Sequence, residues 1–86
     1  MIQNPIKLIL SYYFNLKASA FQGKGQFESA IECSMKAMKL SPKSKSILLS
    51  AYAVICDDFR RIKRYDEAIA HTKSAIKTFP EDESFY

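Results

Sequence analysis

The sequence predicts an all-α fold in which four helices form two antiparallel hairpins, and three observations support this. Apolar residues recur at intervals of three and four in four segments, the spacing of a helix with one buried face. No segment has the two-residue alternation of a half-buried strand. Shifting the chain by 38 residues aligns its first half with its second, so the same hairpin occurs twice.

The first hairpin is predicted from helices over residues 5–22 and 26–40. Asn4 is a favourable N-cap, and Pro5 fits the first helical turn, where no backbone N–H is needed. Two glycines in "QGKGQ" permit the left-handed backbone that separates two helices. The expected apolar positions are Ile6, Ile9, Leu10, Tyr13, Phe14 and Phe21 in the first helix, and Phe27, Ala30, Ile31, Ala37, Met38 and Leu40 in the second.

The second hairpin is predicted from helices over residues 45–62 and 65–79. Pro42 ends the helix before it, because its ring disfavours helical geometry at Ser41. The serines at 44 and 46 offer caps for the third helix. The expected apolar positions are Ile47, Leu48, Tyr52, Ile55, Cys56, Phe59 and Ile62 in the third helix, and Tyr65, Ala68, Ile69, Ala75, Ile76 and Phe79 in the fourth.

The residues that the 38-residue shift aligns are similar in size and polarity. They pair Phe14 with Tyr52, Ala18 with Cys56, Phe21 with Phe59, Phe27 with Tyr65, Ala30 with Ala68, Ser34 with Thr72, Ala37 with Ala75, and Pro42 with Pro80. Helices approach closely only where side chains are small, so the recurring alanines predict tight contact between paired helices, with aromatic rings at the flanks.

This order of aromatic, small and proline positions resembles the tetratricopeptide repeat, whose unit is a pair of antiparallel helices. The resemblance covers about residues 11–80, and "FESAI…A…SP" and "YDEAI…A…FP" are its most specific parts. Three features depart from the family pattern: the spacing is 38 residues instead of 34, Lys63 replaces the turn glycine, and Ser34 and Thr72 stand where a bulky residue is preferred. The longer spacing predicts an extra turn in the first helix of each hairpin.

The resemblance implies an α-α superhelix in a single domain of residues 1–86. The first repeat then covers about residues 5–42 and the second about 43–80. Residues 81–86 are a tail or the start of a further repeat. Repeats of this kind bury their faces against neighbours, so two hairpins leave exposed ends. We therefore expect self-association or neighbouring repeats at these ends, whether the chain is complete or a fragment of a longer array.

Charge and hydropathy limit the classes of partner and the cellular compartment that the sequence predicts. Thirteen basic and nine acidic residues give a net charge of +4, and three of the acids lie in the last six residues. The basic excess could attract an acidic partner, a phosphate backbone or a membrane surface. Such an excess is also common on helical proteins that bind none of these. The segment "IKLILSYYF" is too short to span a bilayer and lacks a signal cleavage site, so a cytoplasmic chain without membrane contact is expected.

Reactive residue types are few and show no catalytic arrangement. Cys33 and Cys56 sit at apolar helical positions and are expected to be reduced, buried side chains. His71 is the only histidine and has no orienting group, so it is expected to face solvent or be partly satisfied. Neither a phosphate-binding loop nor a metal-ligand pattern is present in the sequence. The sequence thus predicts no enzyme, no cofactor and no metal.

The resemblance implies a protein or peptide interaction module, acting as a small adaptor or as part of a larger helical-repeat regulator. The first helix of each hairpin would line a concave face that binds a peptide or a helix. Aromatic contact and hydrogen-bonding side chains suit an extended peptide with carboxylates. The implied contact residues are Tyr12, Asn15, Ser19, Ala53, Asp57, Arg60 and Arg61. That these residues are simply solvated is an equally open interpretation.

Two alternatives remain open. The cluster "RRIKRY" places four basic residues in 60–64, which could contact phosphates while Tyr65 stacks on a base. Against this nucleic-acid function, basic residues near a helix C-terminus also stabilise the helix dipole, and Tyr65 belongs to the packing pattern. The second alternative is a self-assembling structural scaffold.

Overall fold

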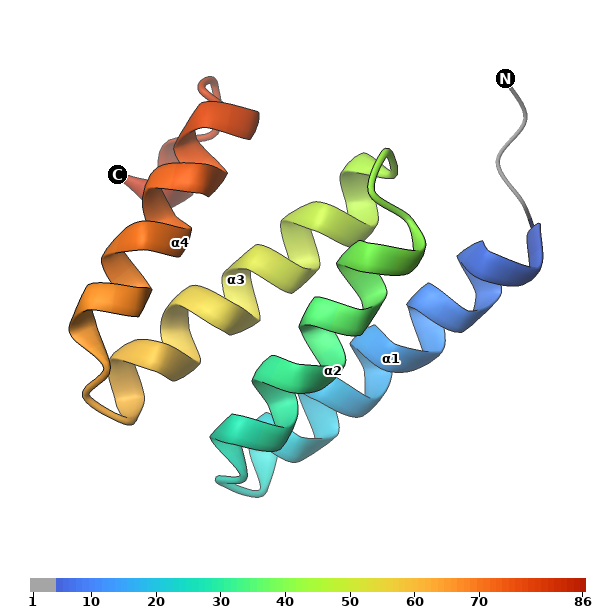
Figure 1. Ribbon diagram of the computed structural model, residues 1–86, viewed down its shortest axis with the longest axis horizontal. Coiled ribbons are helices and arrows are strands. Elements are labelled where there is room, and N and C mark those ends of the chain that lie inside the picture. Colours follow the sequence, from blue (N-terminus) through green and yellow to red (C-terminus); the bar gives the residue numbers. More distant parts are fainter. Residues whose placement is uncertain (1–4) are drawn as a thin grey trace.

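The computed structural model describes residues 5–86, which form four α-helices and one short 3-10 helix (Figure 1). α1 spans Pro5–Gly23, α2 Phe27–Leu40, α3 Lys45–Arg61, α4 Tyr65–Thr78, and η1 Glu83–Phe85. The described residues contain no strand, so the predicted all-α fold is confirmed, and every predicted helix end lies within one residue of the observed end. The Asn4 cap lies outside the described residues.

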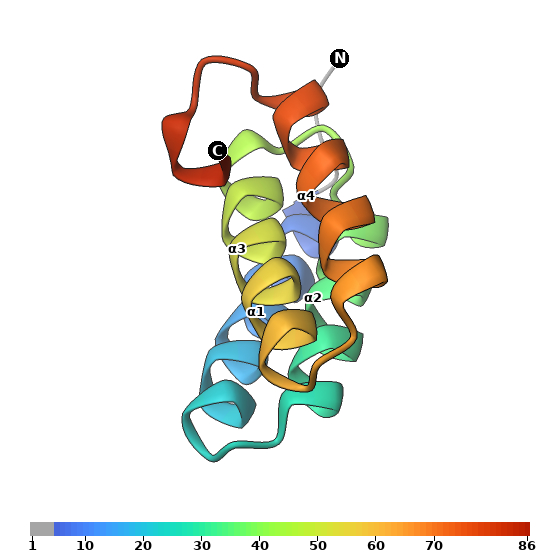
Figure 2. The same cartoon turned by 90° about the vertical axis from the view of Figure 1, so that its left-hand side faces the viewer.

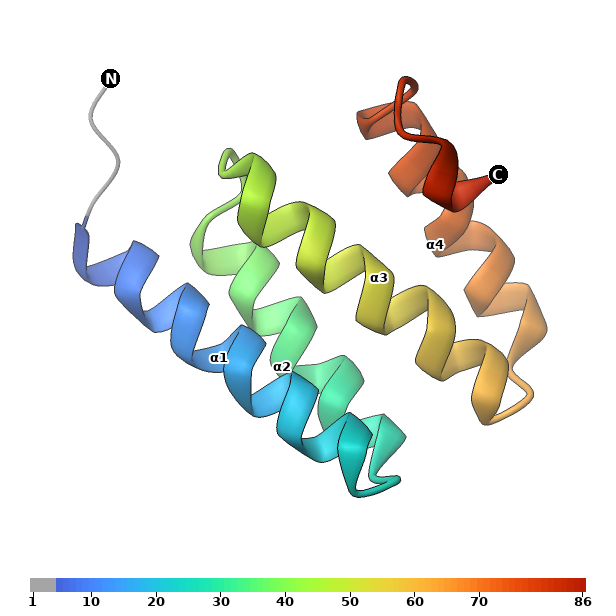
Figure 3. The ribbon, with the colours of Figure 1, turned by 180° about the vertical axis from the view of Figure 1, so that it is seen from behind.

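The helices stack in two layers. α1 and α3 form one layer and α2 and α4 the other, as the side view shows (Figure 2). α3 packs against both α1 and α2, while α4 packs against α3, so α1 and α4 lie at opposite ends of the stack (Figure 3). α1 and α3 have 19 and 17 residues, whereas α2 and α4 have 14 each. The first helix of each hairpin is thus the longer one, as the 38-residue spacing predicts.

Two hydrophobic clusters hold the stack together. In one cluster the fully buried Ala18 and Ala30 and the buried Cys33 join α1 to α2, with Phe14, Phe21 and Val54 packed around them. In the other, Ile31 of α2 and Ala68 of α4 pack with Ile55 and Phe59 of α3. α3 contributes to both clusters, so it joins the two hairpins through apolar contact.

Both hairpin turns have the same hydrogen-bond pattern. In the first, Gln26 N donates to Phe21 O over 2.9 Å and Gly25 N to Gln22 O over 3.0 Å. The second repeats these bonds 38 residues later, from Arg64 N to Phe59 O and from Lys63 N to Arg60 O. This Schellman motif needs a left-handed residue, and φ is 78° at Gly25 and 65° at Lys63. The lysine therefore occupies a glycine position.

The turn after each hairpin is also repeated. Ser44 N donates to Ser41 O over 3.2 Å, and Ser44 Oγ accepts from Ile47 N, so Ser44 caps α3 as predicted. Asp82 N donates to Phe79 O over 3.1 Å in the same register. Residues 79–85 thus follow the path of residues 41–47, and Phe85 corresponds in the 38-residue register to Ile47 in the first turn of α3.

Several residues predicted to be apolar packing positions are exposed. In α1, Ile9 and Tyr13 expose 66% and 52% of their surface, whereas Phe14, Ala18 and Phe21 pack in the core. In α4, Tyr65 and Ile69 expose 54% and 53%, because no described helix covers the side of α4 that α3 covers on α2. Ile6 and Leu10 are also exposed, and Cys56, predicted to be buried, is half-buried.

Candidate functional site

The seven predicted contact residues lie in the layer formed by α1 and α3. Ser19 and Ala53 are exposed. The other five bond to neighbouring groups: Tyr12, Asn15, Asp57, Arg60 and Arg61. The α3 residues come together in one network, whereas the α1 residues are distributed along the seam between the helices.

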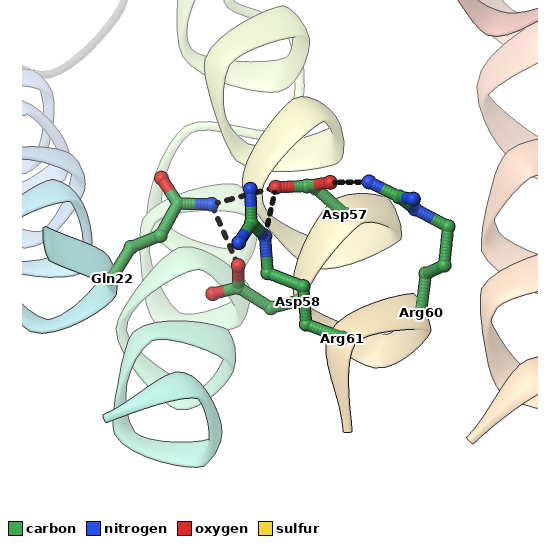
Figure 4. A network of polar contacts seen from close by, with 5 residues as sticks. All are labelled: Gln22, Asp57, Asp58, Arg60 and Arg61. Carbon is green, nitrogen blue, oxygen red and sulfur yellow. Dashed lines mark hydrogen bonds and ion pairs between the residues drawn. The ribbon is translucent and has the colours of Figure 1, made fainter. Parts of the chain in front are cut away.

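Asp57 is the centre of the polar network on α3 (Figure 4). Its carboxylate accepts from Arg60 Nη2 over 2.5 Å and from Arg61 Nε over 2.8 Å. Gln22 Nε2 of α1 donates to it over 3.3 Å, and also to Asp58 Oδ1 over 2.6 Å. The network therefore ties the C-terminal end of α1 to that of α3, and two arginines neutralise and exceed the charge of Asp57.

The pKa values of the two neighbouring aspartates are shifted in opposite directions. Burial raises the pKa of Asp57, but the hydrogen bonds and charges of Arg61 and Arg60 outweigh it, so the pKa lies below its usual value. Burial raises the pKa of Asp58, and the charge of Asp57 adds to this more than Arg61 offsets it. The bond from Gln22 lowers the pKa of Asp58 without cancelling the rise. In turn, bonding to Asp57 raises the pKa of the Arg61 guanidinium.

Two of the predicted α1 residues link the helices. Asn15 Nδ2 donates to the backbone O of Ile47 over 3.4 Å, and its Oδ1 is buried without a hydrogen-bond partner. The Tyr12 hydroxyl lies 3.2 Å from Ser46 Oγ at the exposed edge of the same seam. Asn15 is thus chiefly a link between α1 and α3, while Tyr12 still exposes 52% of its surface.

A groove of about 610 Å³ lies between α3, α4 and the tail after α4. Three of the predicted residues line it: Ala53, Asp57 and Arg60. Its apolar wall consists of Cys56, Tyr65, Ala68, Ile69, Phe85 and Tyr86, and Thr72 and Lys73 add polar groups. A groove of this size with an apolar wall and few polar groups is the usual form of a binding site for a side chain or small ligand.

Sequence reasoning missed the part of the groove on α4 and the tail. Periodicity predicts Tyr65 and Ile69 to be packing residues, but it cannot show whether a further helix covers them, and both are exposed. Phe85 lies against Tyr52 with ring centroids 6.4 Å apart, and the Tyr86 hydroxyl donates to Pro80 O over 2.9 Å. Gln22 could have been found, since it continues the stripe of Tyr12, Asn15 and Ser19 by one turn.

The basic cluster at residues 60–64 is largely paired. Arg60 and Arg61 contact Asp57, and Arg64 bonds to Glu67 through both Nε and Nη2. Arg61 and Arg64 also lie over the rings of Phe27 and Phe59, with centroid distances of 5.7 and 5.1 Å. Their guanidinium groups therefore contribute to the packing of the turn.

Repeated helix hairpins stacked through α3 are the architecture of a helical-repeat protein. Residues 11–44 match the tetratricopeptide repeat family, which confirms the resemblance seen in the sequence. The matched residues cover most of α1 and all of α2, which together form the first hairpin. No curated protein matches the chain, and no solved structure does either.

Two further properties concern the part of the chain that the structure describes. None of its helices is both long and apolar enough to cross a membrane. Within residues 5–86 there is also no group of three or more His, Cys, Asp or Glu side chains that could hold a metal ion. Cys33 and Cys56 are both free thiols.

Proposed function

We propose that this chain binds a peptide or a helix of another protein on the face formed by α1 and α3. The observation that supports this proposal best is the groove of about 610 Å³ beside α3, because three residues expected to contact a partner line it. Ala53 contributes a small side chain to its lining, and Asp57 and Arg60 contribute polar groups. The contact surface continues over Tyr12 and Ser19 of α1.

The chemistry of the groove favours a partner with an apolar side chain next to a carboxylate. Tyr65, Ala68 and Ile69 offer apolar contact to such a side chain. Arg60 exposes 65% of its side chain and Lys73 is exposed, whereas the charge of Asp57 is already neutralised. The local excess is therefore positive, and an arginine is well suited to pair with a carboxylate.

We expect residues 1–86 to form one binding domain in the cytoplasm that catalyses no reaction and holds no cofactor. The two free thiols support a reducing compartment. We expect the α1 end of the stack to be covered by neighbouring repeats or by a second copy, because it exposes large apolar side chains, whereas the groove lies at the α4 end.

A peptide array tests the proposal. The probes are short fluorescent peptides that contain one aromatic or aliphatic residue flanked by glutamates, and the measurement is fluorescence anisotropy. We expect saturable binding that Arg60→Glu weakens at least about tenfold, since charge reversal replaces attraction by repulsion. Arg64→Glu is the matched control, because Arg64 lies outside the groove and pairs with Glu67.

The same variants distinguish peptide binding from nucleic-acid binding. A phosphate-binding cluster would lose affinity for a single-stranded oligonucleotide with either variant, and this affinity would fall steeply with salt. Equal loss with Arg60→Glu and Arg64→Glu, together with oligonucleotide binding, would contradict the peptide proposal. Failure of every probe peptide to bind at the groove would contradict it as well.

A further inference from the structure

α1 carries an apolar stripe on the side away from the core. Five residues at intervals of three and four lie along it, and all are exposed: Ile6, Ile9, Tyr13, Leu16 and Ala20. Leu10 widens the stripe and exposes 41% of its surface. Intervals of three and four residues are those of a coiled-coil seam, where one helix packs along another.

The same face of α3 is buried. In the 38-residue register, Ile9 corresponds to Ile47 and Tyr13 to Ala51, both with no exposed surface, and Leu16 corresponds to Val54, which packs against the α1–α2 cluster. The positions that join hairpins on α3 therefore bear apolar side chains of equal or larger size on α1, and there they are exposed. Such a face is of the type that packs against another helix.

We propose that a second copy of this chain covers the stripe, with α1 of one copy packed antiparallel against α1 of the other. With about 200 Å² for a fully exposed side chain of this size, the large residues of the stripe expose roughly 600 Å² in one copy. Two copies would bury about 1,200 Å² together, which is the lower limit for a specific interface. The expected dimer is thus a weak one, formed at micromolar concentrations.

The antiparallel direction follows from the residues along the stripe. A twofold axis at Tyr13 places the large Ile6 against the small Ala20 of the second copy, and Leu10 against its Leu16. It also keeps the two Lys17 side chains apart, each over its own Tyr13 ring at 5.4 Å. A parallel pair would instead put Lys17 against Lys17, where the like charges repel each other.

A head-to-tail arrangement is the main competitor, and the tail argues against it. In that arrangement α1 of a second copy would dock beside α4 as α3 docks beside α2. Ile9 of the incoming helix would then need the position that Phe85 holds against Tyr52. The self-pairing of α1 needs no such displacement.

Sedimentation equilibrium of the full chain over an about hundredfold range of concentration tests the proposal. We expect a monomer–dimer equilibrium that Leu16→Glu and, separately, Ile9→Glu weaken at least about tenfold. Both side chains are mostly exposed, so the variants keep their helix content by circular dichroism. Ile69→Glu, a change at an equally apolar exposed position of α4, should leave the equilibrium unaltered.

Disulfide cross-linking tests the direction, in a background where Cys33 and Cys56 are replaced by alanine. Tyr13→Cys lies on the twofold axis and should form an intermolecular disulfide, whereas Ile6→Cys should not. Cross-linking at both positions would show a parallel pair and overturn the antiparallel proposal. A monomer at every concentration would overturn the self-pairing altogether. So would a dimer that Ile69→Glu dissociates and that an equimolar mixture of Leu16→Glu and Ile69→Glu restores, because this result would show head-to-tail docking.

Discussion

Gln22 Nε2 of α1 donates to Oδ1 of the fully buried Asp58 of α3 over 2.6 Å, and this bond joins the two hairpins. The second oxygen of Asp58 is buried without a hydrogen-bond partner. Gln22 therefore provides the one side-chain donor that the structure gives to this carboxylate within the described residues. A buried carboxyl group that depends on a single donor makes the inter-hairpin contact sensitive to substitution and to pH.

Gln22→Ala should destabilise the fold by about 1–3 kcal/mol, because it leaves the Asp58 carboxylate without its donor. Urea unfolding followed by circular dichroism measures the change. Gln26→Ala is the control, since Gln26 is exposed and its side chain makes no cap bond. It should change stability by less than about 0.5 kcal/mol. Equal effects of the two variants would show that the Gln22 bond contributes nothing.

The raised pKa of Asp58 predicts a pH-dependent difference between the wild type and Asp58→Asn. The folded chain holds the Asp58 proton more tightly than the unfolded chain, whose carboxyl titrates near about 3.9. This contribution is fully present below that value and is lost as pH rises through the folded pKa. The stability of the wild type relative to Asp58→Asn should therefore fall as the pH rises above the pKa of the unfolded carboxyl group.

Urea unfolding of both proteins at several pH values measures this difference. The lowered pKa of Asp57 acts in the opposite sense, since its stabilisation is present at higher pH and is lost as the carboxylate protonates. Both proteins contain Asp57, so its contribution largely cancels in the comparison. A difference that stays constant across the range would contradict the assignment to Asp58.

Lys63→Gly should stabilise the second hairpin by about 1 kcal/mol, because a side chain is strained at a φ of 65°. The corresponding change in the first turn, Gly25→Ala, should destabilise by a similar amount, since φ there is 78°. Gly23→Ala is the matched control. Gly23 lacks a positive φ and has no atom within 4 Å of an added Cβ, so alanine should be neutral or mildly stabilising. Thermal and urea unfolding distinguish these three outcomes by their signs.

The two equivalent alanines should respond differently to enlargement. Ala30 is fully buried among residues of α1, α2 and α3, so Ala30→Leu overpacks the core and should cost about 1–3 kcal/mol. Ala68 is 8% exposed and lines the groove, so Ala68→Leu can extend into open space at a smaller cost. The same change narrows the groove and should weaken peptide binding. Chemical unfolding and anisotropy measure the two effects, and equal stability losses would contradict the difference in packing.

Cys56 provides a native reporter for the groove. It lines the groove and is half-buried, whereas Cys33 is buried, so a thiol reagent should label one site in the folded chain and two in urea. Burial raises the pKa of the Cys56 thiol, and the bond to Thr72 only partly offsets this. The labelling rate should therefore still be rising above about pH 8.5, where an ordinary thiol is half ionised.

Mass spectrometry of peptides from the labelled protein identifies the modified cysteine. A peptide bound in the groove should slow labelling of Cys56 without exposing Cys33. Labelling of Cys33 at the same rate as Cys56 in the folded chain would contradict the packing of the α1–α2 cluster.

The sequence alone determined the helices, their ends and their pairing into hairpins, because these depend on signals within a few residues. Apolar spacing identified each helix, Pro42 and the turn around Gly25 placed the ends, and the 38-residue repeat showed the duplication. The sequence also marked the turn at Lys63, because this lysine stands where the repeat pattern has a glycine, and its φ is positive in the structure.

Only the tertiary structure decided which apolar residues are buried and which polar residues are free. Ile31 and Ile69 occupy the same position in the repeat, yet Ile31 is 5% exposed and Ile69 is 53% exposed. The difference arises because α3 covers Ile31, whereas Ile69 lines the open groove. Likewise Asn15 shares its stripe with Ser19, but the carbonyl of Ile47 happens to lie within reach of Asn15. Periodicity fixes which face of a helix is apolar, while burial depends on what lies opposite that face, and this is a contact between residues distant in the chain.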